Sequence, residues 1–179
     1  MPRSSKEEVK LSEEKILSKL KRNASLSDYA LSKDLGYSRQ KIWRIKKQLE
    51  QNKTIWGYTT TFNEKKRGFI QCTILIKRSS RLLSEADSDY FLKNGFSELK
   101  EKYHLDIESI VSTHGKYDWM ITVHAFDIIS VRNFITELQT NFNEYISDII
   151  MLESATAIKK QWIFNPELKE DRNILKNLL

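Results

Sequence analysis

The stretch from residue 28 to residue 47 meets the demands of a helix-turn-helix, in which two helices cross closely around a tight turn. The first helix needs a small residue at the crossing, the turn needs a Gly that adopts a positive φ, and the second helix needs apolar anchors. Suitable residues occupy all of these positions: Leu31, Ser32, Leu35, Gly36, Ile42 and Ile45. The pattern predicts a helix-turn-helix, with a helical hairpin of purely structural use as the alternative.

The residues around this window predict a small helical domain that is followed by a strand. Apolar residues at helical spacing indicate a first helix: Leu11, Ile16, Leu17 and Leu20. Ser27 and Ser38 are typical N-caps of the second and third helices, and the third should run to Asn52. The alternating residues 54–62 are typical of a strand, and the charged cluster at 63–68 is typical of a linker.

Beyond residue 68, the pattern predicts strands and helices in the order βαββαβ. The expected elements are a strand at 69–77, a helical segment at about 84–103, strands at 106–112 and 119–125 joined by a turn at 114–116, a helix, and a strand at 145–156. The helix before the last strand has one apolar face, formed by Val131, Phe134, Ile135 and Leu138. This order is that of a ferredoxin-like domain, an antiparallel sheet with two helices on one face. Because one chain leaves the other face bare, we expect a homodimer.

The fold class is therefore predicted to be α+β, and 179 residues are enough for two small domains. We expect a helix-turn-helix domain at 1–53, a linking strand and linker at 54–68, a ferredoxin-like domain at 69–157 and a C-terminal extension at 158–179. The extension begins with Trp162, Ile163 and Phe164 and should continue, after Pro166, as a short helix that carries Leu168, Leu175 and Leu178.

Basic charge is concentrated in the first third of the chain. Residues 1–67 hold 17 Lys and Arg against 8 Asp and Glu, about +9, whereas residues 68–179 hold 13 against 16, about −3. A basic domain joined to a mildly acidic one is typical of a nucleic-acid reader linked to a module with another task. The alternative is an ordinary solvated, lysine-rich surface.

The composition narrows the class of protein. With 40% hydrophobic and 11% aromatic residues, the chain can bury a core. Its longest apolar runs, 74–76 and 149–152, are far shorter than the roughly 20 residues of a membrane span, and the charged start predicts no export signal. The single Cys72 cannot form an internal disulfide or a cysteine-based zinc site, so we expect a cytoplasmic protein without a cofactor.

The third predicted helix separates an apolar side from a polar one. At about 100° per residue, its buried side should hold Ser38, Ile42, Ile45 and Leu49. The predicted DNA-binding residues are Ser38, Arg39, Gln40, Lys41, Trp43, Arg44, Lys46 and Lys47. Gln pairs with adenine, Arg pairs with guanine and a Trp edge packs on thymine methyls, while Lys46 and Lys47 suit phosphates. Double-stranded DNA is thus the expected partner; the alternatives are a solvated lysine face and a Trp43 packed on the first helix.

With these motifs, the chain resembles the Lrp/AsnC (feast/famine) family of transcription regulators over roughly residues 9–157. The resemblance lies in four segments: Leu35-Gly36-Tyr37-Ser38, Leu49-Glu50, Ile55-Trp56-Gly57-Tyr58-Thr59 and Thr113-His114-Gly115-Lys116-Tyr117-Asp118. It implies DNA binding by the first domain, a linking strand that pairs with its twin in a dimer, and effector sensing and oligomerisation, up to tetramers or octamers, by the second domain. We therefore expect a regulator that reads a pseudo-palindromic operator.

The resemblance also implies an effector site. Small molecules such as amino acids would bind between dimers near the hairpin, at Thr113, Gly115, Tyr117 and Asp118. The alternative role for Asp118 is to cap its own hairpin turn.

Two other functions compete with a regulator: an enzyme like the haem-pathway decarboxylases that share this architecture, and a ligand-binding protein without DNA binding. His104, His114 and His124 are the candidate catalytic or metal-binding residues, and they show neither metal-ligand spacing nor a neighbouring Cys or acidic cluster. No Gly-rich phosphate loop or nucleophile elbow occurs in the sequence. The sequence therefore predicts a protein that is not an enzyme.

Overall fold

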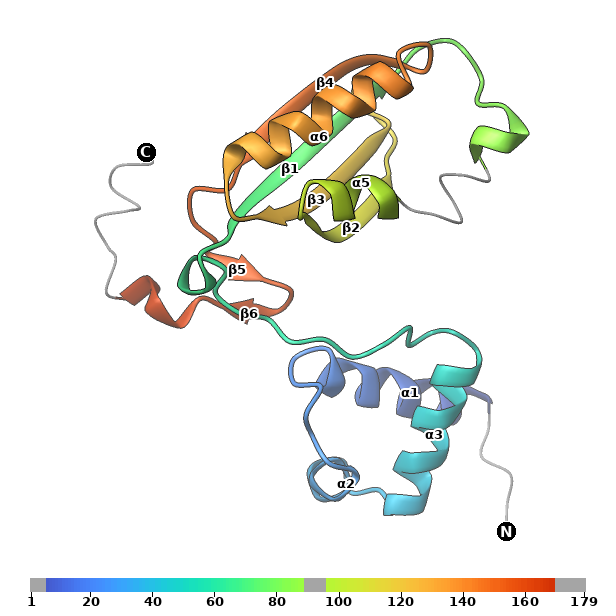
Figure 1. The fold of residues 1–179 in the computed structure, drawn as a ribbon. Coiled ribbons are helices and arrows are strands. Elements are labelled where there is room, and N and C mark those ends of the chain that lie inside the picture. The colour runs from blue at the N-terminus through green and yellow to red at the C-terminus, as the bar shows by residue number, and fades with distance from the viewer. Residues whose placement is uncertain (1–5, 89–95, 170–179) are drawn as a thin grey trace. The chain divides into compact units, whose positions relative to one another are not determined.

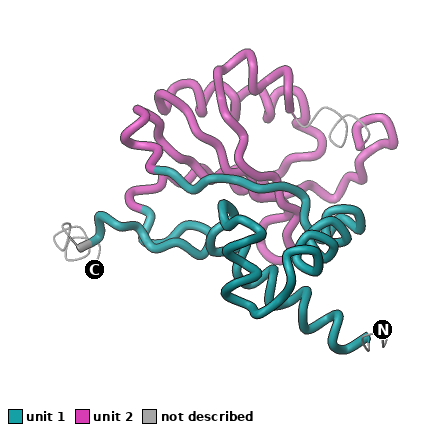
Figure 2. The backbone as a smooth tube through the Cα atoms, turned by 90° about the horizontal axis from the view of Figure 1, so that it is seen from below, with its two compact units in different colours: residues 1–62, 157–179 teal, residues 63–156 magenta. Residues whose placement is uncertain are grey.

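The computed structural model describes residues 6–88 and 96–169. The chain divides into two compact units, one formed by residues 1–62 and 157–179 and the other by residues 63–156 (Figure 2). No described helix is long and apolar enough to cross a membrane.

Three helices form the core of the first unit: α1 (Lys6–Leu20), α2 (Asp28–Leu35) and α3 (Arg39–Gln51) (Figure 1). Their buried side chains make one cluster, namely Ile16, Leu20, Leu31, Ile42, Ile45 and Leu49. The predicted caps are confirmed, because Ser27 and Ser38 accept hydrogen bonds from the backbone N–H groups of Ala30 and Lys41. Gly36 ends α2 at φ 68°, the left-handed conformation that Gly adopts most readily, and thereby makes the turn.

Residues 54–62, predicted as a linking strand that pairs with its twin in a dimer, are not assigned to a strand within the single chain. A strand needs the backbone of a partner for its hydrogen bonds, and the alternating side chains alone cannot supply one. The linker cluster that follows contains a short 3-10 helix, η1 (Lys65–Arg67), which ends at Gly68.

The second unit is a four-stranded antiparallel sheet with helices on one face, as predicted. Its strands are β1 (Ile70–Arg78), β2 (Asp106–Ser112), β3 (Trp119–Ala125) and β4 (Ile146–Glu153), in the order β2-β3-β1-β4. The helices are α5 (Ser97–Lys102) and α6 (Ile128–Asn141). On α6, Val131, Phe134 and Leu138 are buried against Ile74, Ile121 and the other inward residues of the sheet. The opposite sheet face carries apolar side chains such as Leu152, which is 52% exposed.

The helical segment predicted at 84–103 is not one continuous helix. Residues 85–88 are helical and α5 begins at Ser97, while residues 89–95 lie outside the described part of the chain. Phe96 has φ 63°, which no α-helix accommodates, and its ring is buried edge-on against Phe134, with the ring centroids 6.1 Å apart. The burial of Phe96 in the core thus sets where α5 can start.

The C-terminal extension begins as a small hairpin of β5 (Lys159–Lys160) and β6 (Ile163–Phe164), followed by the 3-10 helix η2 (Pro166–Lys169). Two residues in positive-φ conformations, Gln161 and Trp162, form its turn. The short helix predicted after Pro166 is therefore only one 3-10 turn as far as Lys169, and Leu175 and Leu178 lie outside the described residues.

Candidate nucleic-acid interface

Helix α3 is anchored firmly enough to present a fixed outer face. Ile42 and Leu49 are fully buried or nearly so, and Gln48 donates a hydrogen bond of 3.2 Å to Glu13 on α1. Ser38 was predicted on the buried side of α3, and this prediction is wrong, because Ser38 is exposed at the helix start. It caps α3, and a cap sits before the first turn, so the helical spacing did not apply to it.

The four residues predicted to face the DNA groove lie on the outer face of α3 and are all exposed: Gln40, Trp43, Arg44 and Lys47. Trp43 is 55% exposed, so it does not pack into the core with α1. The Lys47 ammonium lies 5.2 Å from the centroid of the Trp43 ring, within the range of a cation–π contact. An indole and a guanidinium on the same exposed face are suited to contact base edges and thymine methyl groups in the major groove.

Two further cations at the start of α3 rest on aromatic rings. The Arg39 guanidinium lies 4.5 Å from the centroid of Tyr29, and the Lys41 ammonium lies 3.9 Å from that of Tyr37. These contacts restrict long, flexible side chains whose charged ends rest on the rings. The helix start therefore offers positioned cations beside the groove-facing stripe.

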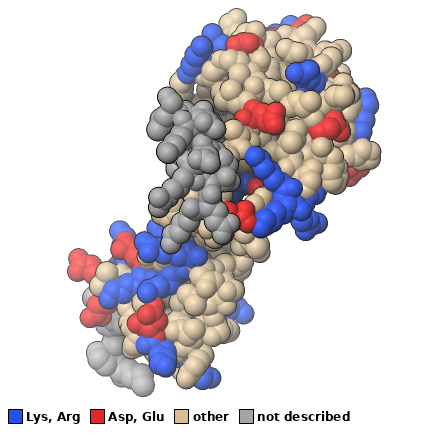
Figure 3. Space-filling view, turned by 90° about the vertical axis from the view of Figure 1, so that its left-hand side faces the viewer, with Lys and Arg blue, Asp and Glu red and all other residues tan. Residues whose placement is uncertain are grey.

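Lys46 has a different environment from its basic neighbours. It is half-buried, and its ammonium forms an ion pair of 2.8 Å with Asp28 at the start of α2. This pair joins the two helices of the helix-turn-helix, so a phosphate would have to compete with Asp28 for Lys46. In the lower part of Figure 3, Lys and Arg side chains gather over part of the three-helix region, with Asp and Glu side chains among them.

Comparison with known proteins decides the family. No family model matches the chain. It is 33% identical over 124 residues to the transcriptional regulator AzlB of Bacillus subtilis (strain 168), an alignment that spans 68% of this chain and 73% of AzlB. The chain belongs to the Lrp/AsnC family of transcription regulators. It is thus a DNA-binding regulator.

Solved structures share the fold of this Lrp/AsnC protein. An AsnC family transcriptional regulator from Agrobacterium tumefaciens matches with a TM-score of 0.61 at 20% identity, over 87% of this chain and 96% of that one. The regulator NMB0573 from Neisseria meningitidis, solved as a complex with L-Met, matches with a TM-score of 0.62 at 19% identity, over 89% of this chain and 97% of that one.

The hairpin between β2 and β3 in this Lrp/AsnC protein is held by hydrogen bonds within the hairpin and by a contact with the end of β1. Thr113 donates backbone and side-chain hydrogen bonds to the carbonyl oxygens of Asp118 and Tyr117, at 2.8 and 2.6 Å. The Asp118 carboxylate accepts a hydrogen bond of 2.8 Å from the backbone N–H of Arg78 and lies 3.5 Å from Nε of its guanidinium. The backbone hydrogen bond from Arg78, aided by the guanidinium charge, lowers the pKa of Asp118. Asp118 therefore ties the hairpin to the end of β1.

The three histidines lie in separate parts of the second unit. His104 follows α5, His114 is exposed in the hairpin, and His124 is buried on β3, 3.0 Å from the Glu108 carboxylate. Over residues 6–88 and 96–169, no group of three or more His, Cys, Asp or Glu side chains could hold a metal ion.

Proposed function

We propose that the regulator reads a pseudo-palindromic operator by inserting α3 into the major groove. The observation that carries this proposal is the exposed stripe on a helix whose opposite face is buried. Gln40 would pair with adenine, Arg44 with guanine, and Trp43 would pack on thymine methyls. Arg39, Lys41 and Lys47 would contact phosphates, with Ser38 at the helix start and Lys46 beside them.

A mobility-shift assay with genomic fragments tests this proposal, because a recovered site would also reveal the operator sequence. A shift that persists in excess non-specific DNA supports a sequence-specific regulator. Failure to bind any fragment would favour a ligand-binding protein that has lost DNA contact. We infer that the protein is not an enzyme, because the proteins that it resembles are transcriptional regulators.

A Lys47→Ala variant should bind all DNA sequences more weakly, because a phosphate contact carries no sequence information. The slope of log affinity against log salt concentration should become shallower by about 1. Titrations at several salt concentrations measure both effects. Lys100→Ala, which removes the same charge from exposed α5, should leave the slope unchanged; an unchanged slope for Lys47→Ala would remove Lys47 from the interface.

The protein should be at least a homodimer, because the sheet face opposite α6 exposes apolar side chains such as Leu152 and Val111. A dimer with two-fold symmetry presents two copies of α3, which explains the expected palindrome with half-sites about one helical turn, or a multiple of it, apart. Light scattering at micromolar concentration should give at least twice the 21.2 kDa of one chain. A mass of one chain would contradict both the dimer and the palindrome.

We further propose that an amino acid or similar metabolite modulates the regulator through the second unit, in the region of Thr113, Gly115, Tyr117 and Asp118. NMB0573, solved with L-Met, offers a precedent in a protein of the same fold. Such an effector must bind two states of the protein with different affinity, since equal affinity would shift nothing.

A further inference from the structure

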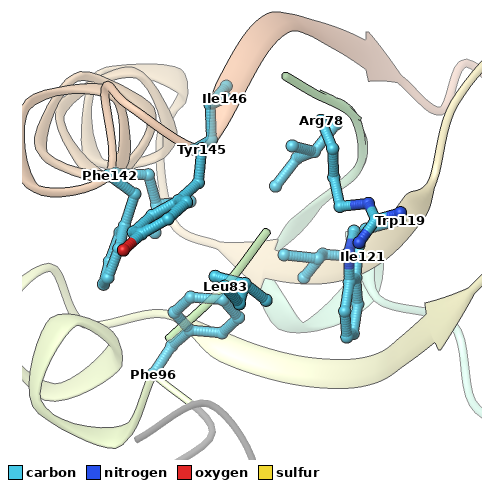
Figure 4. A pocket seen from close by; sticks show the side chains of 10 residues that line it. Arg78, Leu83, Phe96, Trp119, Ile121, Phe142, Tyr145 and Ile146 are labelled. Carbon is cyan, nitrogen blue, oxygen red and sulfur yellow. The ribbon is translucent and has the colours of Figure 1, made fainter. Parts of the chain in front are cut away.

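The C-terminal extension follows β4 of the second unit in sequence, yet it belongs to the first unit. From Ala157 onward the chain groups with residues 1–62 (Figure 2). The described residues that line the small apolar cavity of the second unit, among them Ile121, Phe142 and Tyr145, all lie within residues 63–156 (Figure 4). The chain therefore passes between its two units twice, after residue 62 and again after residue 156.

The hairpin at the start of the extension is too small to be stable by itself. Its strands β5 and β6 pair through two residues each, and an isolated two-stranded hairpin is marginally stable at best. Its turn holds Gln161 at φ 42° and Trp162 at φ 68°, left-handed conformations that cost free energy in residues other than Gly. Contacts outside the hairpin must therefore stabilise it.

Trp162 makes a contact that joins the hairpin to the three helices. The Lys21 ammonium, in the turn that follows α1, lies 4.2 Å from the centroid of the indole ring, which is a cation–π distance. Gln161, Trp162 and Ile163 line the same open groove as residues 20–25 and 54–61. Since Trp162 is 55% exposed, it docks on the surface of the unit and is not part of its core.

The turn between α1 and α2 leads directly into the helix-turn-helix. Within the turn, the Ser25 hydroxyl donates a hydrogen bond of 2.7 Å to the side-chain oxygen of Asn23. Ser27 then caps α2, and Asp28 at the start of α2 forms the 2.8 Å ion pair with Lys46 of α3. A continuous series of contacts thus runs from the hairpin through the turn to α3.

We propose that Trp162 is a positioning residue for DNA binding: it docks the C-terminal hairpin on the α1–α2 turn, and the docked turn holds the start of α2 and thereby α3. A turn that is loose in the free protein must be ordered when DNA binds, and this ordering lowers the affinity. The extension also connects the second unit to the helix-turn-helix without passing through residues 54–62. The effect on DNA rests on the proposed function, whereas the docking does not.

Amide hydrogen exchange of the full-length protein tests the docking at residues 22–26, where backbone N–H groups donate hydrogen bonds within the turn. Trp162→Ala should make these amides exchange at least threefold faster, whereas Trp162→Phe keeps a ring for Lys21 and should keep most of the protection. Lys21→Gln should accelerate exchange as Trp162→Ala does, with no further increase in the double variant. Phe164→Ala is the matched control: it removes a 65% exposed ring that contacts Lys159 of the same hairpin, and exchange should stay unchanged.

Fluorescence anisotropy with the operator recovered by mobility shift tests the positioning role. Trp162→Ala should weaken operator binding about two- to fivefold, the factor that corresponds to the loss of one exposed cation–π contact. The slope of log affinity against log salt concentration should not change, because the indole contacts no phosphate. Trp162→Phe and Phe164→Ala should bind as the unchanged protein does. Circular dichroism verifies the fold of each variant, and Lys21→Gln replaces Trp162→Ala if the latter does not fold.

Unchanged exchange at residues 22–26 in both Trp162→Ala and Lys21→Gln would overturn the docking. Faster exchange without any loss of operator affinity would overturn the positioning role, as would an affinity loss that Phe164→Ala reproduces. Failure of the unchanged protein to bind any DNA would contradict the proposed function alone, since the exchange measurement involves no DNA and still decides the docking.

Discussion

An Arg44→Ala variant should bind its operator about 5- to 150-fold more weakly than the unchanged protein, a loss of roughly 1–3 kcal/mol. The guanidinium is exposed on the outer face of α3, so its removal deletes a bidentate contact with guanine and leaves the core intact. Binding to non-specific DNA should fall much less, because only the operator offers the guanine in register. Fluorescence anisotropy with operator and scrambled duplexes measures both affinities.

Arg132→Ala provides the matched control for Arg44. It removes the same charge from an exposed position on α6, in the other compact unit, and should leave operator affinity within twofold. If Arg44→Ala also leaves operator affinity unchanged, or lowers operator and scrambled affinity equally, then Arg44 does not read a base. The specificity would then have to come from Gln40 and Trp43.

A Phe134→Ala variant should lower the free energy of unfolding of the second unit by about 3–5 kcal/mol. Phe134 is completely buried between α6 and the sheet, and Phe96 packs edge-on against its ring. Truncation removes this burial and leaves a cavity that the surrounding strands can close only in part. Since domains of this size are typically stable by about 5–15 kcal/mol, much of the unit's stability would be lost.

Urea denaturation at a fixed protein concentration measures this loss. Ile129→Ala is the matched control, because Ile129 lies on the same helix and is 65% exposed, and it should change the free energy of unfolding by less than about 0.5 kcal/mol. Equal effects of the two substitutions would show that α6 does not use Phe134 as its anchor.

Local signals in the sequence determined where α2 and α3 end and which side chains of α6 are buried in the core. Ser27, Gly36 and Ser38 act on backbone groups within a few residues of themselves, so they fix the ends of α2 and α3 wherever the rest of the chain lies. The spacing of Val131, Phe134 and Leu138 likewise fixes which side of α6 is buried. The antiparallel sheet with helices on one face followed because strands and helices in this order pack in few ways.

Tertiary structure alone decided the features that depend on residues far apart in the chain. The pairing of Asp118 with Arg78 joins residues 40 positions apart, and Asp28 reaches Lys46 only because α2 and α3 cross. Phe96 interrupts the predicted helix because the core accepts its ring, whereas residues 54–62 form no strand because the chain gives their backbone no partner. Periodicity reports which residues can be buried or exposed, but a long-range contact depends on which segments the fold brings together.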